Sequence, residues 1–393
     1  MRPPVYMDYH ATTPVDPRVL EAMLPYFSEK FGNASSRQHS FGWMAEEGVE
    51  SARVVVARSL GCEPKEIIFT AGATEGNNLA LKGVAEAYRA KGDHIITVQT
   101  EHKSVLDTCK KLEKSGLKVT FLGVDEFGVV DPSDVRNAIT PKTILVSVMT
   151  ANNEIGTIQD ITAIGAICRE RDVVLHTDAT QAVGKIPIDV NAMKVDLLSL
   201  SGHKVYGPKG IGALFIRNRN PRVALAAQSE GGGHERGLRS GTLNVPGIVG
   251  LGAALGLAAS SRDEEYERTK RYRDRMLMAL TRGLDEVYLN GHPASRLPNN
   301  LNLSFVRVDE NALMMSMKDV AVSTGSACSS STPEPSHVLR ALRLPAARVS
   351  SAIRFGLGRM TTEEEVDYVI DRVLTEVRRL RSHSPAMKVA SAV

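Results

Sequence analysis

The sequence has few cysteines, little net charge and no recognisable targeting segment, and each shortage excludes a class of protein. Its 393 residues include four cysteines, Cys62, Cys109, Cys168 and Cys328, without paired spacing. That pattern argues against a zinc knuckle or a disulfide framework and favours a reducing compartment. We expect Cys62, Cys109 and Cys168 to be small apolar residues in helical surroundings.

Charge is close to balance, with 48 basic residues, 45 acidic residues and a net charge of +3. Because there is neither a basic block nor an acidic tail, nucleic acid is not expected as the main partner. The first residues lack both the apolar core of a signal peptide and an Arg/Ser-rich presequence. No uncharged apolar run is expected to be long enough to span a bilayer. These absences favour a cytoplasmic protein without a membrane partner.

What the sequence does contain, from residue 66 onward, is an alternation of short apolar strands with helices. Strands are expected at 66–70, 94–97, 118–122, 143–150, 173–177, 197–201 and 212–216. Alternation of this kind predicts an α/β fold with a mostly parallel, seven-stranded sheet. Before these strands, a single helix is expected over about 18–27. After them follow a long helical stretch and a second, smaller α/β segment with strands over 300–305, 320–323 and 353–357. We expect a large domain over 15–259, a small domain over 1–14 and 260–380, and a frayed tail over 381–393.

Polar clusters follow five of the expected strands. Ligands of parallel sheets bind beyond the carboxyl ends of the strands, so these clusters are expected to converge at one edge of the sheet. They are Gly72–Asn78, Thr100–His102, Ala151–Gly156, Asp178–Gln181 and Ser201–Lys204. Their convergence predicts a binding site as well as a fold.

Three of these clusters have the chemistry that pyridoxal phosphate (PLP) needs. Lys204 ends an apolar strand and suits a Schiff-base lysine, although taken alone an ordinary loop lysine is the commoner case. Asp178 ends another strand and suits the acid that keeps a pyridine nitrogen protonated. Between Thr70 and Asn78 the chain turns from a strand into a helix whose free amides suit a phosphate. Together, and in this order, they predict a PLP site.

The segment over 323–336 places Cys328 among small, polar and chain-breaking residues. Cysteine normally prefers a core, so we interpret Cys328 as a reactive thiol on a movable arm rather than an accidental surface cysteine. A glycine-rich segment over 231–242 interleaves glycine with charged side chains. A flexible linker is the alternative there, and we favour a phosphate or subunit contact that involves Thr242.

These motifs resemble those of the cysteine desulfurases of the IscS/NifS type, which belong to the fold-type-I PLP enzymes with the aspartate aminotransferase fold. The resemblance spans about residues 6–380 and points to the group I, iron–sulfur branch. The matching motifs are Ala11–Pro14, Gly72–Asn78, Thr100–Lys103, Asn152–Gly156, His176–Gln181, Ser201–Lys204, Arg239–Thr242 and Ser326–Ser329. The resemblance implies removal of sulfur from L-cysteine, with L-alanine as product and a persulfide left on Cys328.

The resemblance also implies a role for each motif residue. Lys204 would form a Schiff base with PLP and later move the substrate Cα proton. His102 would stack on the cofactor ring as acid or base, and Cys328 would hold the sulfur. Asn153 and Arg354 would clamp the substrate, because a guanidinium suits a carboxylate. Cofactor contacts are implied for Ala73, Thr74, Asn153, Asp178, Gln181, Ser201, His203, Lys204 and Thr242.

Within that cofactor set, Asp178 would pair with the pyridinium nitrogen and Gln181 with the phenolate oxygen, while Thr242 would come from the partner subunit of a homodimer. The implied partners are L-cysteine, an iron–sulfur scaffold protein and other sulfur acceptors, with tRNA thiolation as a further use of the sulfur. Cys328 is also the one candidate metal ligand, through its persulfide at a cluster held by a partner. Relatives of this branch often carry an aromatic residue after a C-terminal Ser-Pro, whereas Ala386 follows Pro385 here.

Three rival interpretations remain open at this point. A selenocysteine lyase would use the same parts, whereas another fold-type-I aminotransferase would not need Cys328. A non-catalytic scaffold with this fold is disfavoured, because Lys204, Asp178 and Cys328 are all present.

Overall fold

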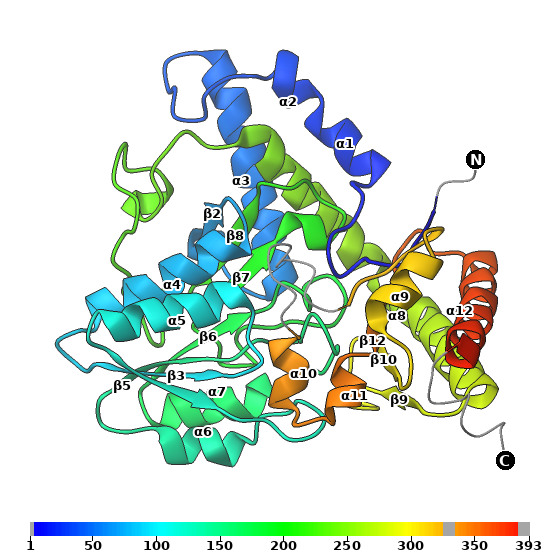
Figure 1. Ribbon diagram of the computed structural model, residues 1–393. Coiled ribbons are helices and arrows are strands. Elements are labelled where there is room, and N and C mark those ends of the chain that lie inside the picture. The colour runs from blue at the N-terminus through cyan, green and yellow to red at the C-terminus, as the bar shows by residue number, and fades with distance from the viewer. Residues whose placement is uncertain (1–3, 325–334, 384–393) are drawn as a thin grey trace, which may run out of the picture.

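The computed structural model describes residues 4–324 and 335–383 (Figure 1). Its largest element is a seven-stranded sheet in the order β2-β8-β7-β6-β5-β3-β4. The strands are β2 (Ile67–Thr70), β3 (His94–Val98), β4 (Lys118–Leu122), β5 (Thr143–Ser147), β6 (Val174–Asp178), β7 (Leu197–Ser201) and β8 (Gly212–Ile216). All run in one direction except β8, which is antiparallel to both of its neighbours. The prediction of a mostly parallel, seven-stranded sheet is confirmed.

Hydrophobic cores lie on both faces of this sheet. Along β2, Ile67 and Phe69 belong to one core and Ile68 to the other, as the period of two in a strand requires. Burial on both faces explains why these strands read as nearly continuous apolar runs. The main helices packed on the sheet are α3 (Ser40–Leu60), α4 (Ala73–Ala87), α5 (Lys103–Lys114), α6 (Pro132–Ala138) and α7 (Ile161–Glu170).

A second unit is built on a three-stranded antiparallel sheet of β12 (Ala352–Gly356), β10 (Asn300–Phe305) and β9 (Val287–Leu289). It has a core of its own, separate from those of the large sheet. The parallel pair β1 (Val5–Tyr6) and β11 (Val320–Ala321) ties the start of the chain to this unit. The division into a large domain over 15–259 and a small domain over 1–14 and 260–380 stays a prediction.

The remaining elements are short. The helices are α1 (Pro17–Met23), α2 (Pro25–Ser28), α9 (Glu310–Ser316), α10 (His337–Ala341) and α11 (Ala346–Val349). The 3₁₀ turns are η1 (Pro64–Glu66), η2 (Gly202–Lys204) and η3 (Glu235–Gly237).

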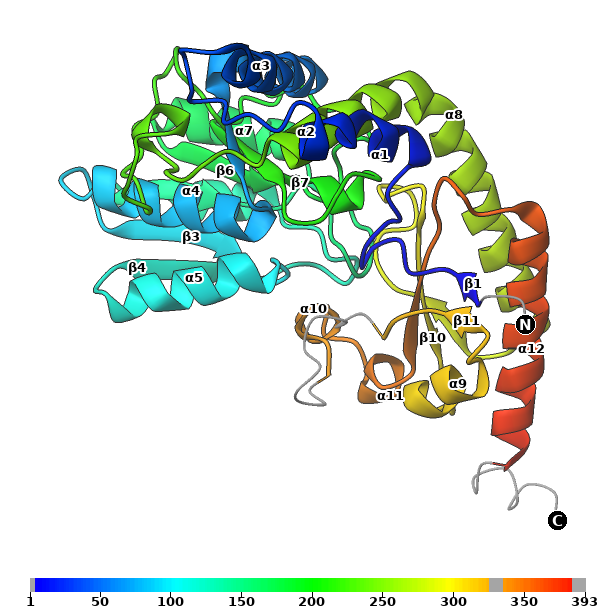
Figure 2. The same ribbon diagram turned by 90° about the horizontal axis from the view of Figure 1, so that it is seen from above.

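The long helix α8 (Val245–Gly283) connects the two units, with its first half beside α3 and its second half beside α12 (Glu363–His383) (Figures 1 and 2). By length and composition alone, α8 is apolar enough to cross a membrane, which corrects the expectation that no such run exists. Half of the most apolar stretch of α8 is buried inside the fold. Helices at the centre of a globular core have the same composition.

Two helix boundaries differ from those predicted. The single helix expected over 18–27 is two helices, because Pro25 lacks the N–H that would continue α1 and instead begins α2. The last helix continues to His383 instead of fraying from residue 381. Arg381 is buried and donates hydrogen bonds to the carbonyls of Asp285 and Val306, which holds this last turn in place. The rest of the predicted tail, 384–393, lies outside the described residues.

Candidate active site

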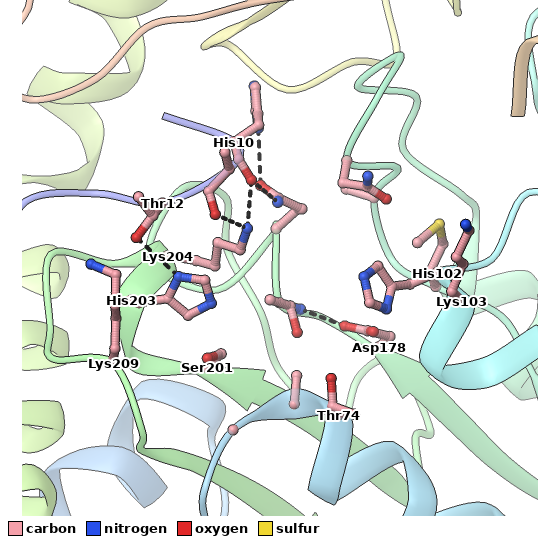
Figure 3. A pocket seen from close by; sticks show the side chains of 18 of the residues that line it. His10, Thr12, Thr74, His102, Lys103, Asp178, Ser201, His203, Lys204 and Lys209 are labelled. Atoms are coloured by element: carbon pink, nitrogen blue, oxygen red, sulfur yellow. Dashed lines mark hydrogen bonds between the residues drawn. The ribbon is translucent and has the colours of Figure 1, made fainter. Parts of the chain in front are cut away.

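The carboxyl ends of the parallel strands border a cavity of about 600 Å³ (Figure 3). Each of the five predicted polar clusters contributes to its wall, so the predicted convergence is confirmed. Ten of its lining residues are Ala73, Thr74, His102, Asn153, Asp178, Gln181, Ser201, His203, Lys204 and Arg354. In Figure 3, His102 and Asp178 lie on one side of the cavity and Lys204 with His203 on the other.

Asp178 is buried at the end of β6, where two donors hold its carboxylate. Its Oδ2 accepts a hydrogen bond from Asn77 Nδ2 at 2.8 Å, and its Oδ1 accepts one from the Thr180 N–H at 3.0 Å. Both bonds fix the orientation of the carboxylate. Two residues earlier on the same strand, burial lowers the pKa of His176 to about 4, so that imidazole is neutral and brings no competing cation. Asp178 is thus the kind of acceptor that a protonated ring nitrogen requires.

Lys204 lies in η2, directly after β7, and points to the start of the chain. Its Nζ donates to the carbonyl oxygens of His10 and Ala11 at 2.5 and 2.6 Å (Figure 3). His10 is fully buried and its Nδ1 lies 2.9 Å from Gln181 Oε1, and burial lowers its pKa well below the ordinary value, so its ring is neutral. The N-terminal segment is therefore part of the cavity wall. In the sequence, only the motif Ala11–Pro14 had indicated this.

The strand-to-helix turn that the sequence analysis predicted as a phosphate-binding site lies where α4 begins. Gly72 precedes the helix with a φ of +151°, and a Cβ built there would come 3.6 Å from Ser201 Oγ. Only glycine adopts this conformation readily, and the first amides of α4 are left free to bind an anion. Nearby, His203 Nδ1 lies 3.1 Å from Thr12 Oγ1. Burial and then the charge of Lys204 lower the pKa of His203 to about 4, so it is a neutral hydrogen-bonding group.

From the small sheet, Arg354 on β12 reaches the same cavity and is 1% exposed. Its guanidinium donates to Asp8 Oδ1 at 2.8 Å and to the carbonyl of Asn153 at 2.9 Å. Its buried Nε has no hydrogen-bond partner among the described residues. A buried guanidinium with a spare N–H suits a substrate carboxylate.

His102 is the N-cap of α5 on the cavity wall. Its Nδ1 accepts a hydrogen bond from the backbone N–H of Ser104 at 3.2 Å and lies 2.8 Å from the Ser104 hydroxyl. Since Nδ1 is the acceptor, the proton of the neutral ring is assigned to Nε2.

The segment that carries Cys328 begins and ends beside this cavity, although Cys328 itself lies outside the described residues. On one side, Ser323 and Arg354 exchange backbone hydrogen bonds of 2.7 and 3.3 Å. On the other side, the Ser336 hydroxyl donates to Glu154 Oε2 at 2.5 Å. The next residue, His337, lines the cavity and has its Nε2 2.9 Å from the carbonyl of Glu101.

One described residue of the predicted set is not brought to the cavity: Thr242 is exposed and does not line it. The sequence analysis gave no role to Asn77, which donates a hydrogen bond to Asp178, or to His337, which does not follow an expected strand.

Burial raises the pKa of Cys62, Cys109 and Cys168 to about 12, so their predicted apolar role is confirmed. No cluster of three metal-binding side chains occurs among the described residues.

The donors and acceptors fit PLP at three points. Asp178 offers an ionised acceptor to a ring nitrogen, Lys204 offers an amine, and the start of α4 with Ser201 offers a cradle for a phosphate. A cavity of about 600 Å³ is of the size that binds cofactors of this kind.

Comparisons with known proteins give matches along nearly the whole chain. The aminotransferase class-V family model matches residues 5–369. The cysteine desulfurase IscS of Anaeromyxobacter dehalogenans is 58% identical over 385 residues, which are 98% of this chain and 95% of that protein. The cysteine desulfurase IscS of Rickettsia rickettsii is 54% identical, over 97% of this chain and 93% of its own length.

Solved structures give the same result. A NifS-like protein has a TM-score of 0.89 at 38% identity and covers 96% of this chain and 100% of its own. A structure of SspA in complex with cysteine has a TM-score of 0.80 at 40% identity, with 90% of this chain and 98% of its own covered.

Proposed function

This chain belongs to the class-V aminotransferase family and, within it, to the cysteine desulfurases of the IscS/NifS type, and on that premise we propose how its residues divide the reaction. It is a PLP-dependent enzyme of fold type I that takes sulfur from L-cysteine and releases L-alanine. The observation that carries the residue assignment is the meeting of Lys204, Asp178 and the start of α4 at one cavity.

We assign the cofactor end first. When bound, PLP supplies an electron sink for the charge left on the substrate Cα. Asp178 would hold the pyridinium nitrogen and Gln181 would donate to the phenolate oxygen, while Lys204 would hold the cofactor through its amine and supply the base for the Cα proton. His102 would stack on the ring and would give or take a proton at its Nε2. The phosphate contacts are Ala73, Thr74, Ser201 and His203, with Thr242 from the partner subunit.

At the substrate end, Arg354 binds the carboxylate of L-cysteine and Asn153 helps to orient it. Cys328, as thiolate, attacks the substrate sulfur. A new S–S bond forms on Cys328 while the Cβ–S bond breaks, and its electron pair stays with the organic fragment. That fragment takes up protons and leaves as L-alanine, while Cys328 keeps the sulfur as a persulfide. The anchoring of Ser323 and Ser336 beside the cavity supports this role for the segment between them.

We propose a homodimer, supported by an apolar face on α1, α2, α3 and the loop before α3. Phe27, Phe31 and Trp43 are 62%, 61% and 55% exposed there, an unusual amount for large apolar side chains that lie close in sequence. The buried ion pair between Arg53 and Glu235, 2.7 Å long, fixes the glycine-rich segment to α3. A second copy on this face would cover it and bring Thr242 to the neighbouring phosphate. Sedimentation of a monomer at micromolar concentration would contradict this proposal.

We also propose that the enzyme is cytoplasmic and passes its sulfur to a scaffold protein for iron–sulfur cluster assembly and to other acceptors, with tRNA thiolation among the uses. The names of the relatives support this role. The persulfide on Cys328 is the candidate ligand of a cluster held by such a partner.

Absorbance and product assays with purified holoenzyme test the assignment of Cys328. The visible band of bound PLP should change when L-cysteine is added, and alanine should appear. Cys328→Ser should keep the band and lose alanine release by more than about 100-fold. The matched control is Cys62→Ser. Cys62 is half-buried and its thiol is protonated at neutral pH, so this variant should behave as wild type. A keto acid in place of alanine would instead favour the aminotransferase alternative.

A further inference from the structure

Lys185 is an inward-facing cation that the reaction described above does not use. It follows Gln181 by one turn, and its Nζ donates to Gln181 Oε1 at 3.1 Å. The side chain is half-buried overall, but its ammonium lies against Gln181 and close to Lys204. No ion pair joins it to a carboxylate within the described part of the chain. An ammonium in that position is costly unless it is paired, hydrogen-bonded or loses its proton.

Lys185 and Lys204 line the same small cavity, of about 30 Å³. The charged or titratable groups around Lys185, besides two tyrosines, are Lys204, His10, His203, Arg262, Glu265 and Arg359. The carboxylate among them, Glu265, is already engaged by Arg359 at 2.6 Å. Among the described residues, Glu265 is thus the one carboxylate that lines this small cavity, and Lys185 forms no ion pair with it.

Among the described residues, two influences act on the Lys204 amine in opposite directions. The carbonyls of His10 and Ala11 accept hydrogen bonds from it and favour the protonated form. A protonated amine can neither bond to a carbon atom nor take up a proton. A like charge nearby disfavours protonation, and Lys185 supplies that charge.

The same ammonium also fixes the amide of Gln181. A lysine ammonium only donates, so the Gln181 atom that faces it is the oxygen. The amide NH₂ must then turn the other way, where it donates to the carbonyl of His10 at 3.0 Å. That orientation presents an N–H at the wall of the main cavity, as a ring phenolate oxygen requires.

We propose that Lys185 is a positioning residue that orients the Gln181 amide and disfavours protonation of Lys204. The inference rests on the proposed role of Lys204 in holding PLP. Burial, and after it the charge of Lys204, lowers the pKa of Lys185 to about 7. Lys185 therefore carries its charge below about pH 7 and loses it as the pH rises, so its effect on Lys204 is greatest on the acid side.

The test is a pH titration of the visible absorbance of bound PLP in the purified holoenzyme. In Lys185→Met the midpoint should rise by about one pH unit, because a like charge has been removed. Lys185→Gln, which keeps a hydrogen bond to Gln181 and removes the charge, should give the same rise and serves if the methionine variant does not fold. Lys185→Arg should stay near wild type. Lys194→Met, which removes an exposed lysine elsewhere, is the control for net charge.

An unchanged midpoint in folded Lys185→Met or Lys185→Gln that still binds PLP would overturn the inference and leave the proposed function intact. A wild-type protein without the band, or without alanine release, would instead overturn the proposed function. The acid limb of kcat/KM should move in the same direction as the midpoint, and a loss of stability alone would not produce that movement.

Discussion

At the cofactor end of the active site, the key side chains come from neighbouring strands of one sheet, whereas at the substrate end they come from three distant parts of the chain. Asp178 ends β6 and Lys204 follows β7, and these two strands pair directly. Arg354 reaches Asp8 across 346 positions and Asn153 across 201. The first arrangement depends on the register of one sheet, and the second depends on how two structural units pack together. Changes at the two ends should therefore have separable consequences.

The largest effect is expected at the cofactor end, from Lys204→Ala. Without its amine, the enzyme loses both the covalent hold on PLP and the group that moves the Cα proton, so alanine release should fall by at least about 10⁴-fold. Absorbance spectra and an alanine assay measure both losses. Lys194→Ala, at an exposed position, should leave both unchanged. If Lys204→Ala kept the absorbance band of PLP bound to the wild-type enzyme, Lys204 would not hold PLP covalently, and the assignment of the cofactor end would be wrong.

Asp178→Asn should come next, with activity lowered roughly 10²–10³-fold while PLP stays bound. The amide keeps the size of the carboxylate and still accepts from Thr180, but it no longer carries the charge that keeps the ring nitrogen protonated. Kinetics of alanine release and fluorescence of the bound cofactor provide the measurement. Near-normal turnover would mean that the ring nitrogen has another partner.

The cofactor end should also be sensitive to acid. The pKa of His176 is lowered from 6.5 to about 4, so the unfolded chain binds more protons than the folded one between those values. Stability is therefore steady above about pH 6.5 and decreases as the pH falls towards 4, by roughly 2–3 kcal/mol from this residue. Urea unfolding at several pH values measures the slope. His176→Gln should make the slope shallower without abolishing it, because the pKa values of His10 and His203 are lowered as well. An equally steep slope in that variant would assign the acid sensitivity elsewhere.

The smallest effect is expected where the cysteine segment meets the substrate end. Ser336→Ala removes the hydrogen bond to Glu154 and the N-cap of α10, at a cost of about 1 kcal/mol. Sulfur transfer should decrease a few-fold while the absorbance of bound PLP stays the same. Ser350→Ala, at an exposed serine that bonds only within its own helix turn, is the control. A changed cofactor spectrum in Ser336→Ala would mean that the two ends are coupled.

The same comparison explains what the sequence could predict. Asp178 and Lys204 were predicted from their places after apolar strands, because strand ends of a parallel sheet converge whatever the loops do. The antiparallel direction of β8 was not predictable, since side chains alternate between the two faces of a sheet in the same way whichever direction the strand runs. The strand around Arg354 was predicted, but the position of its guanidinium depends on Asp8 and Asn153, hundreds of residues away, and only the family resemblance indicated it.

Lys185 shows a different limit. It lies after Gln181 in a turn without a strand-end pattern, and its sequence context is that of an ordinary surface lysine. Its significance comes from the nearness of Lys204, which follows another strand. Contacts of this kind depend on tertiary packing and leave no local signal in the sequence.

The most direct test of the separation between the two ends is a titration of Arg354→Met with L-cysteine. Before cysteine is added, the variant should show the same absorbance band of bound PLP as the wild-type enzyme. Its response to cysteine should require at least about 100-fold higher concentration, because the carboxylate has lost its guanidinium partner. Arg354→Lys keeps the positive charge but loses the paired N–H donors of the guanidinium. The concentration of cysteine that it needs should therefore lie between those for the wild type and Arg354→Met. A variant that responds at the wild-type concentration, or that purifies without PLP, would contradict the account.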